Sequence, residues 1–165
     1  MSEYDLFFSY QHDIQVMVKE LLTFLKKKYG WRIYLDILEN RTGKPLANQL
    51  SCSIDKSSVF VCFITLKYSQ SNNCKDEFEW AVNVKKKPIV ILMMEKLNLG
   101  DLDEIGFRIS RMTRLNLYKD LPDFKRFNGE TFEMFIRETH LALKLNYDPD
   151  PVSDNEDDAS ETEYV

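Results

Sequence analysis

Long hydrophobic runs are missing from this 165-residue sequence. Its longest apolar runs, Val59–Ile64 and Ile89–Met94, fall far short of the roughly 20 residues that a membrane-spanning helix needs. The first residues lack the basic and apolar regions that make up a signal peptide. We therefore expect a cytoplasmic protein that does not insert into membranes.

Cysteine and histidine are scarce as well. Cys52, Cys62 and Cys74 are odd in number and have no CxxC spacing, which favours reduced thiols in a reducing compartment. The two histidines, His12 and His140, lie far apart along the chain. Because no cysteines cluster near them, we expect no zinc site and no other bound metal.

Several catalytic signatures are absent. The sequence contains neither of the glycine-rich phosphate loops, GxGxxG and GxxxxGK[ST], and no GxSxG nucleophile elbow. A receiver-type phosphorylation site needs acidic residues after the first strand and an aspartate at the end of the third. Ser9-Tyr10 and Thr65 occupy those places here. These absences argue against nucleotide-loop enzymes, serine hydrolases and phosphorylated receivers.

Positive charge is missing from the last 18 residues, Asp148–Val165, which hold eight acidic side chains and no lysine or arginine. With little apolar content, this segment is expected to form a disordered acidic tail. The remaining residues, 1–147, hold all 22 basic residues against 19 acidic ones, a net charge of +3. That excess is too small to indicate nucleic-acid binding.

What is present is an alternation of apolar strands and amphipathic helices. We expect Asp36–Pro45 and Thr65–Asn73 to be polar loops, and Glu95–Arg111 to have loop character with one short helix. The predicted strands are Tyr4–Tyr10, Trp31–Leu35, Val59–Ile64, Ile89–Met94 and Arg114–Leu117. The predicted helices are Asp13–Tyr29, Leu46–Lys56, Cys74–Lys86 and Thr131–Leu145.

This alternation predicts an α/β fold with a doubly wound parallel sheet. Five strands in about 145 residues fit the flavodoxin-like strand order 2-1-3-4-5, with helices on both faces. Ligands of such sheets bind beyond the carboxyl ends of the strands, where the chain order reverses. The segments expected there are Ser9–Asp13, Asp36–Pro45 and Thr65–Glu77.

Glu77 is the most unusual residue of the predicted third helix. At one hundred degrees per residue, the helix places Glu77 among Cys74, Phe78 and Ala81 on its apolar side. A carboxylate in an apolar stripe is costly unless it is paired or functional. The alternative is a first-turn glutamate at the rim of the core, where the helix dipole favours it. Its place directly after the third strand puts it at the predicted ligand crevice.

Four motifs in order resemble those of TIR (Toll/interleukin receptor) domains over residues 4 to about 145. They resemble, respectively, the first strand, the second strand, the third-helix signature and the fourth strand of that family. In this chain they are Tyr4–Tyr10 (YDLFFSY), Gly30–Asp36 (GWRIYLD), Ser71–Phe78 (SNNCKDEF) and Lys87–Ile91 (KPIVI). The loop from residue 37 to Leu46, which contains Gly43, is similar to the family's BB loop.

The resemblance implies two activities. Many TIR domains associate with themselves and with other TIR domains, and a subset cleaves NAD⁺ to nicotinamide and ADP-ribose or a cyclic variant. It implies that NAD⁺ is a substrate rather than a cofactor, that the active form is a homo-oligomer, and that Glu77 is the catalytic residue. The candidates for contacts to NAD⁺ are Phe7, Ser9, Tyr10, Asp36, Arg41, Lys44, Tyr68 and Trp80.

Two features of the sequence depart from the family. Gln11 stands where catalytic members often carry a basic residue, and Glu39–Pro45 lacks the proline-glycine pair of many receptor and adaptor members. Two functions therefore remain open for residues 1–147. The domain is either a self-associating enzyme that cleaves NAD⁺ or a non-catalytic interaction module that acts through its BB loop.

Overall fold

A parallel sheet with the strand order β2-β1-β3-β4-β5 forms the centre of the molecule. The computed structural model describes residues 2–35, 52–120 and 127–146. The strands are β1 (Tyr4–Ser9), β2 (Ile33–Leu35), β3 (Ser57–Ile64), β4 (Ile89–Met93) and β5 (Arg114–Leu115). All four neighbouring pairs are parallel. The predicted fold class and strand order are confirmed.

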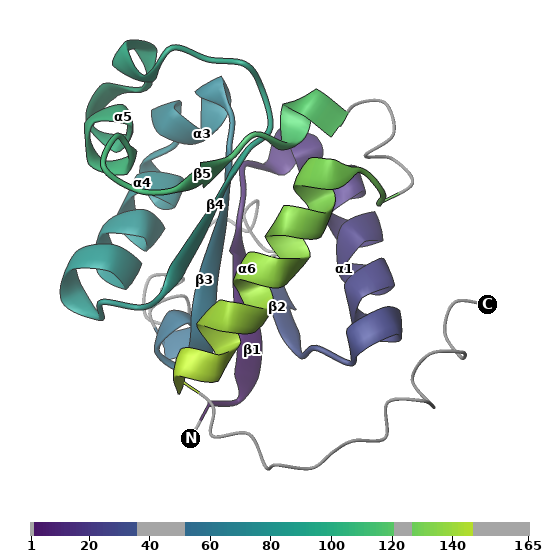
Figure 1. Cartoon of the computed structure of the whole chain (residues 1–165). Helices are drawn as coiled ribbons and strands as arrows, with labels where there is room; N and C mark the ends of the chain where they lie inside the picture. The colour runs from purple at the N-terminus through teal and green to yellow at the C-terminus, as the bar shows by residue number, and fades with distance from the viewer. Residues whose placement is uncertain (1, 36–51, 121–126, 147–165) are drawn as a thin grey trace.

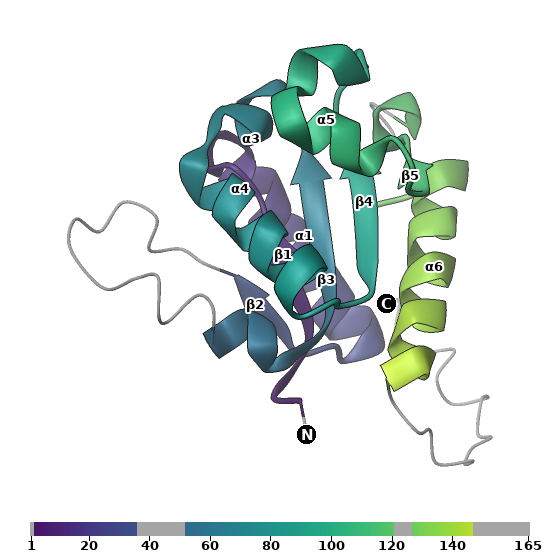
Figure 2. The same cartoon turned by 90° about the vertical axis from the view of Figure 1, so that its left-hand side faces the viewer.

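Helices cover both faces of the sheet (Figure 1). They are α1 (Gln15–Tyr29), α3 (Leu66–Gln70), α4 (Asn72–Glu79), α5 (Asp103–Ile109) and α6 (Glu130–Asn146). Helices α1 and α6 lie on one side, and α3, α4 and α5 lie on the other, as the turned view also shows (Figure 2). Within the described ranges, none of the helices is long and apolar enough to cross a membrane.

Alternation along the strands divides the core in two. In β1, Leu6 and Phe8 face α1 and α6, whereas Phe7 faces the opposite side with α3, α4 and α5. The central strand β3 is buried along its whole length, as expected for a parallel strand that helices cover on both sides. Each face thus has its own hydrophobic core, and the side chains of β1 are shared between them.

Helix α1 shows how local sequence sets the boundaries. The helix ends at Gly30, whose φ of +70° is the left-handed conformation that glycine adopts without strain. The amide of Gly30 donates to the carbonyl of Lys26, and Lys26–Lys28 place positive charge at the carboxyl end of the helix dipole. The predicted end of this helix is therefore confirmed.

Several predicted segments differ from the structure. Thr65–Asn73 is not a continuous loop, because Thr65 caps the short helix α3 by accepting a hydrogen bond from the amide of Tyr68. The segment Glu95–Arg111 contains the expected short helix, α5, and before it a 3-10 helix, Leu99–Leu102, that was not predicted. Strand β5 has only two residues, since Leu117 begins another 3-10 helix. The predicted loop Asp36–Pro45, most of the predicted helix Leu46–Lys56 and the acidic tail lie outside the described residues.

The predicted helix Cys74–Lys86 is interrupted in its middle. Helix α4 changes to a π-helix over Trp80–Val84, and the amide of Lys85 donates to the carbonyl of Trp80, five residues earlier. A π-turn rotates the residues after it relative to a regular α-helix. Consequently Val84 is 52% exposed, while Ala81, predicted on the apolar side, is buried.

Candidate functional site

Two capped helices, α3 and then α4, follow the carboxyl end of β3. Thr65 caps α3, and Ser71 caps α4 by accepting a hydrogen bond from the amide of Cys74. Serine and threonine are preferred at these positions because their hydroxyl oxygens satisfy amides that have no partner inside the helix. The two caps set the starts of both helices, and so fix where Tyr68 and Glu77 lie relative to β1.

The end of β1 lies beside these helices. Strand β1 pairs with β3 up to the partners Ser9 and Cys62, so the carboxyl ends of the two strands lie at the same edge of the sheet. The thiol of Cys74 donates to the carbonyl of Tyr10 at 3.5 Å, which joins the start of α4 to the end of β1. The predicted proximity of Ser9–Asp13 to Thr65–Glu77 is thus confirmed.

Glu77, Ser9 and Tyr68 form a buried polar cluster at this edge. The hydroxyl of Ser9 donates to Oε1 of Glu77 at 2.6 Å and lies 2.7 Å from the phenol oxygen of Tyr68. Ser9 and Tyr68 are fully buried, and Glu77 is 6% exposed. The burial expected for Glu77 from helix periodicity is therefore present, together with a hydrogen-bond partner that offsets the cost of desolvating a carboxylate.

Burial also affects the phenol of Tyr68. Loss of hydration, followed by the nearby Cys62, Cys74 and Glu77, raises the pKa of Tyr68 well above its ordinary value of 10. The hydrogen bond with Ser9 acts in the opposite direction but does not outweigh burial. Tyr68 is therefore a neutral phenol that keeps its proton at physiological pH.

Three of the residues predicted to contact NAD⁺ have side chains that are packed in the core. Phe7 is fully buried between Tyr34 and Phe60, with ring centroids 5.3 and 5.6 Å away, so it does not line an open pocket. The ring of Tyr68 is fully buried and does not offer a face for stacking. Tyr10 belongs to the core on the α1 side, and its phenol accepts a hydrogen bond from Gln15, because strand alternation turns it away from Ser9.

Trp80 has different partners from Glu77. Its indole nitrogen donates to Asp55 Oδ1 at 2.9 Å, and the ammonium of Lys85 lies 5.6 Å from its ring centre. Asp55 lies two residues before β3, so these contacts tie the end of α4 to the amino-terminal side of that strand. The contacts of Trp80 are therefore separate from those of the Ser9–Tyr68–Glu77 cluster. The remaining candidates, Asp36, Arg41 and Lys44, lie outside the described residues.

Gln11, the residue that departs from the family pattern, has a local structural role. Its side-chain oxygen accepts a hydrogen bond from the amide of Asp13 and caps the 3-10 helix His12–Ile14. Asp13 in turn forms an ion pair with Lys67 of α3. This surface pair lowers the pKa of Asp13 and raises that of Lys67, chiefly through their mutual hydrogen bond. Residue types alone did not predict this contact, which joins two segments at the carboxyl edge.

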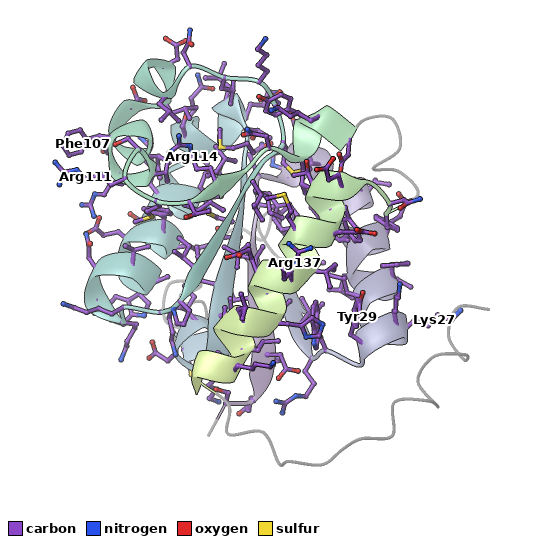
Figure 3. The ribbon with its side chains drawn as sticks, in the orientation of Figure 1. Lys27, Tyr29, Phe107, Arg111, Arg114 and Arg137 are labelled. Carbon is purple, nitrogen blue, oxygen red and sulfur yellow. The ribbon has the colours of Figure 1, made fainter. Side chains whose placement is uncertain are left out.

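A shallow cleft of about 480 Å³ lies on the outer side of α4, against α5. Ion pairs cross it from Lys75 to Glu104 and from Glu79 to Arg108. Beside it, Phe107 projects from α5 with the guanidinium of Arg111 over its ring (Figure 3). None of the lining residues belongs to the Ser9–Tyr68–Glu77 cluster, so this cleft is separate from the candidate site.

The candidate site contains no group of metal ligands in the described part of the chain. No three histidine, cysteine, aspartate or glutamate side chains gather there in an arrangement that could hold a metal ion. All three cysteines are free, and Cys62 and Cys74 are buried. Burial raises the pKa of the Cys62 thiol, which therefore stays protonated and is a poor nucleophile.

Comparison with solved structures shows the same fold in two TIR domains. The TIR domain of the Toll-related receptor TRR-2 from Hydra magnipapillata has 14% sequence identity and a TM-score of 0.64; the match covers 83% of this chain and 98% of that one. The TIR domains of the activated Roq1 resistosome, which recognises the pathogen effector XopQ, have 19% identity and a TM-score of 0.51, with 90% and 92% coverage. A family model described as TIR domain matches residues 6–131. Since that match covers most of the chain, the protein belongs to the TIR domain family.

Proposed function

We propose that this TIR signalling domain associates with copies of itself and, in the associated state, cleaves NAD⁺ to nicotinamide and ADP-ribose or a cyclic variant. Glu77 is the catalytic carboxylate in this proposal. The reaction takes place in the cytoplasm, and NAD⁺ is the substrate rather than a bound cofactor. Association with other TIR domains brings the copies together.

The observation that supports this function best is the position of Glu77. Its carboxylate is 6% exposed and receives a hydrogen bond from Ser9, the last residue of β1, so it lies at the carboxyl edge of the sheet although Glu77 is in the second half of helix α4. In doubly wound sheets, ligands bind at this edge, next to the strand where the order reverses. A carboxylate that is buried at this place, rather than on the solvated side of its helix, is a candidate for function.

The chemistry of NAD⁺ cleavage suits a single carboxylate. Most glycosidases use two, because the leaving oxygen has to be protonated. In NAD⁺ the nicotinamide ring carries the positive charge. It takes the electron pair of the glycosidic bond and leaves as a neutral molecule, so a general acid is unnecessary. Water adds to the ribose carbon and loses a proton, which gives ADP-ribose. Glu77 would orient the ribose hydroxyls and stabilise the positive charge that develops on the sugar.

The hydrogen bond from Ser9 is compatible with this role. An ionised carboxylate has two oxygens and about four positions that accept hydrogen bonds. The bond from Ser9 to Oε1 uses one of these positions. The same bond keeps the side chain in one orientation before substrate arrives.

Nicotinamide release from NAD⁺ tests the proposal. The full chain would be assayed free in solution and crowded on a bead surface, with chromatographic detection of nicotinamide. We expect release by the wild type, faster on beads, and a loss of about 100-fold or more in Glu77→Gln. Glu79→Gln is the matched control, because Glu79 lies on the exposed side of the same helix and pairs with Arg108. Equal release by wild type and Glu77→Gln would exclude catalysis by Glu77.

A non-catalytic interaction module is the second candidate function. The burial of the Ser9–Tyr68–Glu77 cluster favours it. Ser9 and Tyr68 are fully buried, so the polar atoms around Glu77 already satisfy one another in the absence of a ligand. In that case Glu77 holds α4 to β1, and association through the BB loop is the whole function. This reading predicts that replacement of residues 39–45 abolishes pull-down of other TIR domains while no NAD⁺ is consumed at any surface density.

A further inference from the structure

We propose that Ser9 and Tyr68 are positioning residues for the catalytic carboxylate, with Tyr68 acting on Glu77 through the hydroxyl of Ser9. The inference rests on the proposed NAD⁺ cleavage by Glu77. It also replaces the direct contacts with NAD⁺ that the sequence suggested for Ser9 and Tyr68, since both side chains are fully buried.

The three groups form a hydrogen-bonded chain that joins three elements. Tyr68 comes from α3, Ser9 from the end of β1 and Glu77 from α4. The phenol oxygen of Tyr68 lies 2.7 Å from Ser9 Oγ, and Ser9 Oγ lies 2.6 Å from Oε1 of Glu77. The second distance is typical of a strong hydrogen bond between a hydroxyl and a charged carboxylate.

Counting protons gives the chain a direction. A serine hydroxyl has one proton, and Ser9 donates it to Glu77. The contact between Ser9 and Tyr68 therefore needs a proton from the phenol, so Tyr68 donates and Ser9 accepts. When the phenol donates to Ser9, it polarises the hydroxyl and strengthens the bond that Ser9 makes to the carboxylate.

The surroundings keep Tyr68 in the donor state. Burial raises the pKa of its phenol, and the neighbouring thiols of Cys62 and Cys74 are buried too. The Cys62 thiol stays protonated because burial raises its pKa as well. The Cys74 thiol donates to the carbonyl of Tyr10, so its proton is directed away from the chain of three groups.

Backbone contacts hold the two ends of this chain in place. The amide of Tyr68 is bound by the Thr65 cap, and Ser71 caps the helix that carries Glu77. The Tyr68 ring is fully buried in the core on this face of the sheet. Because a displacement of about 1 Å can cost as much as 100-fold in rate, a fixed carboxylate matters more for the chemical step than for binding.

A double-mutant cycle in the nicotinamide assay tests this role. Tyr68→Phe removes only the phenol oxygen. Ser9→Ala removes the hydroxyl through which Tyr68 acts on Glu77. We expect kcat to fall about 10-fold in Tyr68→Phe and further in Ser9→Ala, with KM within about twofold of the wild type. Adding Tyr68→Phe to Ser9→Ala should change kcat by less than about twofold, because the relay is already lost.

Ser69→Ala is the matched control. Ser69 is fully buried on the same short helix as Tyr68, and its hydroxyl donates to the carbonyl of Leu66 rather than toward Glu77. This variant loses a buried hydroxyl beside Tyr68 and should keep kcat within about twofold. A Tyr68→Phe variant with the kcat of wild type, or a double variant whose losses simply multiply, would overturn the inference.

A second readout separates this inference from the proposed function. In protein with ¹³C-labelled glutamate carboxyls, the Glu77 signal is assigned by its loss in Glu77→Gln. The signal should shift in both Ser9→Ala and Tyr68→Phe and stay in place in Ser69→Ala. If the wild type releases no nicotinamide, the proposed function fails while these shifts still support the relay; an unchanged signal in Tyr68→Phe would refute the relay even in an active enzyme.

Discussion

The two faces of the sheet bury different kinds of groups. On the face covered by α1 and α6, the core consists of aliphatic and aromatic side chains such as Phe8 and Phe63, whose ring centroids lie 5.0 Å apart. On the face covered by α3, α4 and α5, the core includes a carboxylate and two hydroxyls that depend on one another, those of Glu77, Ser9 and Tyr68.

Thr139 makes the contrast clear. Its hydroxyl is fully buried on the α6 side but donates to the carbonyl of Phe135, four residues earlier in the same helix. That bond needs no other element, whereas the Ser9 bonds join residues 59 and 68 positions apart. The α1/α6 face is therefore held mainly by non-directional packing, and the opposite face adds directional bonds that fix a carboxylate at the ligand edge.

The largest effect is expected from a cavity in the apolar face. Phe63→Ala should lower the free energy of unfolding by about 3–5 kcal/mol, because Phe63 is fully buried. Urea denaturation measures the loss. Phe107→Ala is the control, since Phe107 is 72% exposed, and it should stay within about 0.5 kcal/mol of the wild type. A loss below about 1 kcal/mol for Phe63→Ala would mean that this core is loosely packed.

A close backbone approach gives the next largest effect, on the α3–α5 face. A Cβ atom on Gly106 would lie 1.9 Å from the carbonyl oxygen of Leu99, so Gly106→Ala should cost about 3 kcal/mol although alanine normally favours a helix. Gly100 has no atom within 4 Å of such a Cβ, and Gly100→Ala should change stability by less than about 0.5 kcal/mol. Equal denaturation midpoints for the two variants would contradict the packing seen here.

Removing one buried hydroxyl from each face compares them directly. Ser9→Ala leaves the Glu77 carboxylate and the Tyr68 phenol without their shared partner and should cost about 2 kcal/mol. Thr139→Val removes a hydroxyl that bonds only its own helix and should stay within about 0.5 kcal/mol. Thermal unfolding followed by circular dichroism measures both. The proposed difference between the faces would be wrong if the two variants lost the same stability.

The smallest expected effect is a pH dependence of the melting temperature, caused by His140 at the edge of the α1/α6 face. His140 of α6 packs edge-on against Tyr29 and Trp31, with centroids 5.4 and 5.1 Å away (Tyr29 is labelled in Figure 3). Partial burial, and secondarily the charge of Lys144, lowers the pKa of His140 below its ordinary 6.5. The unfolded chain therefore binds more protons than the folded one below about pH 6.5, and the melting temperature should fall slightly between pH 7 and pH 5.

His140→Phe isolates that dependence. The variant keeps an aromatic ring against Tyr29 and Trp31 but has no titrating group, so its melting temperature should vary less over the same pH interval. An identical pH dependence in the wild type and in His140→Phe would assign the effect to other groups.

Sequence alone predicted the strands, their order and the family. Continuous apolar runs marked β3 and β4, Gly30 marked the end of α1, and the motifs around Ser71–Phe78 indicated a TIR domain. Helix periodicity also predicted the burial of Glu77, which is 6% exposed. These features depend on neighbours within a few residues along the chain, and such local preferences can be read from residue order.

Only the tertiary structure decided how the candidate site is built. Tyr10 directly follows Ser9 but belongs to the opposite core, and Tyr68 came from a segment that its polar residues marked as a loop. The carboxylate that looked exceptional by its helix register is held by a serine 68 positions away, and that serine contacts a phenol 59 positions away. The pairing of β1 with β3 and the caps of α3 and α4 bring these three groups together. Helix and strand periodicities relate residues only a few positions apart, so they do not predict contacts between residues this far apart in the sequence.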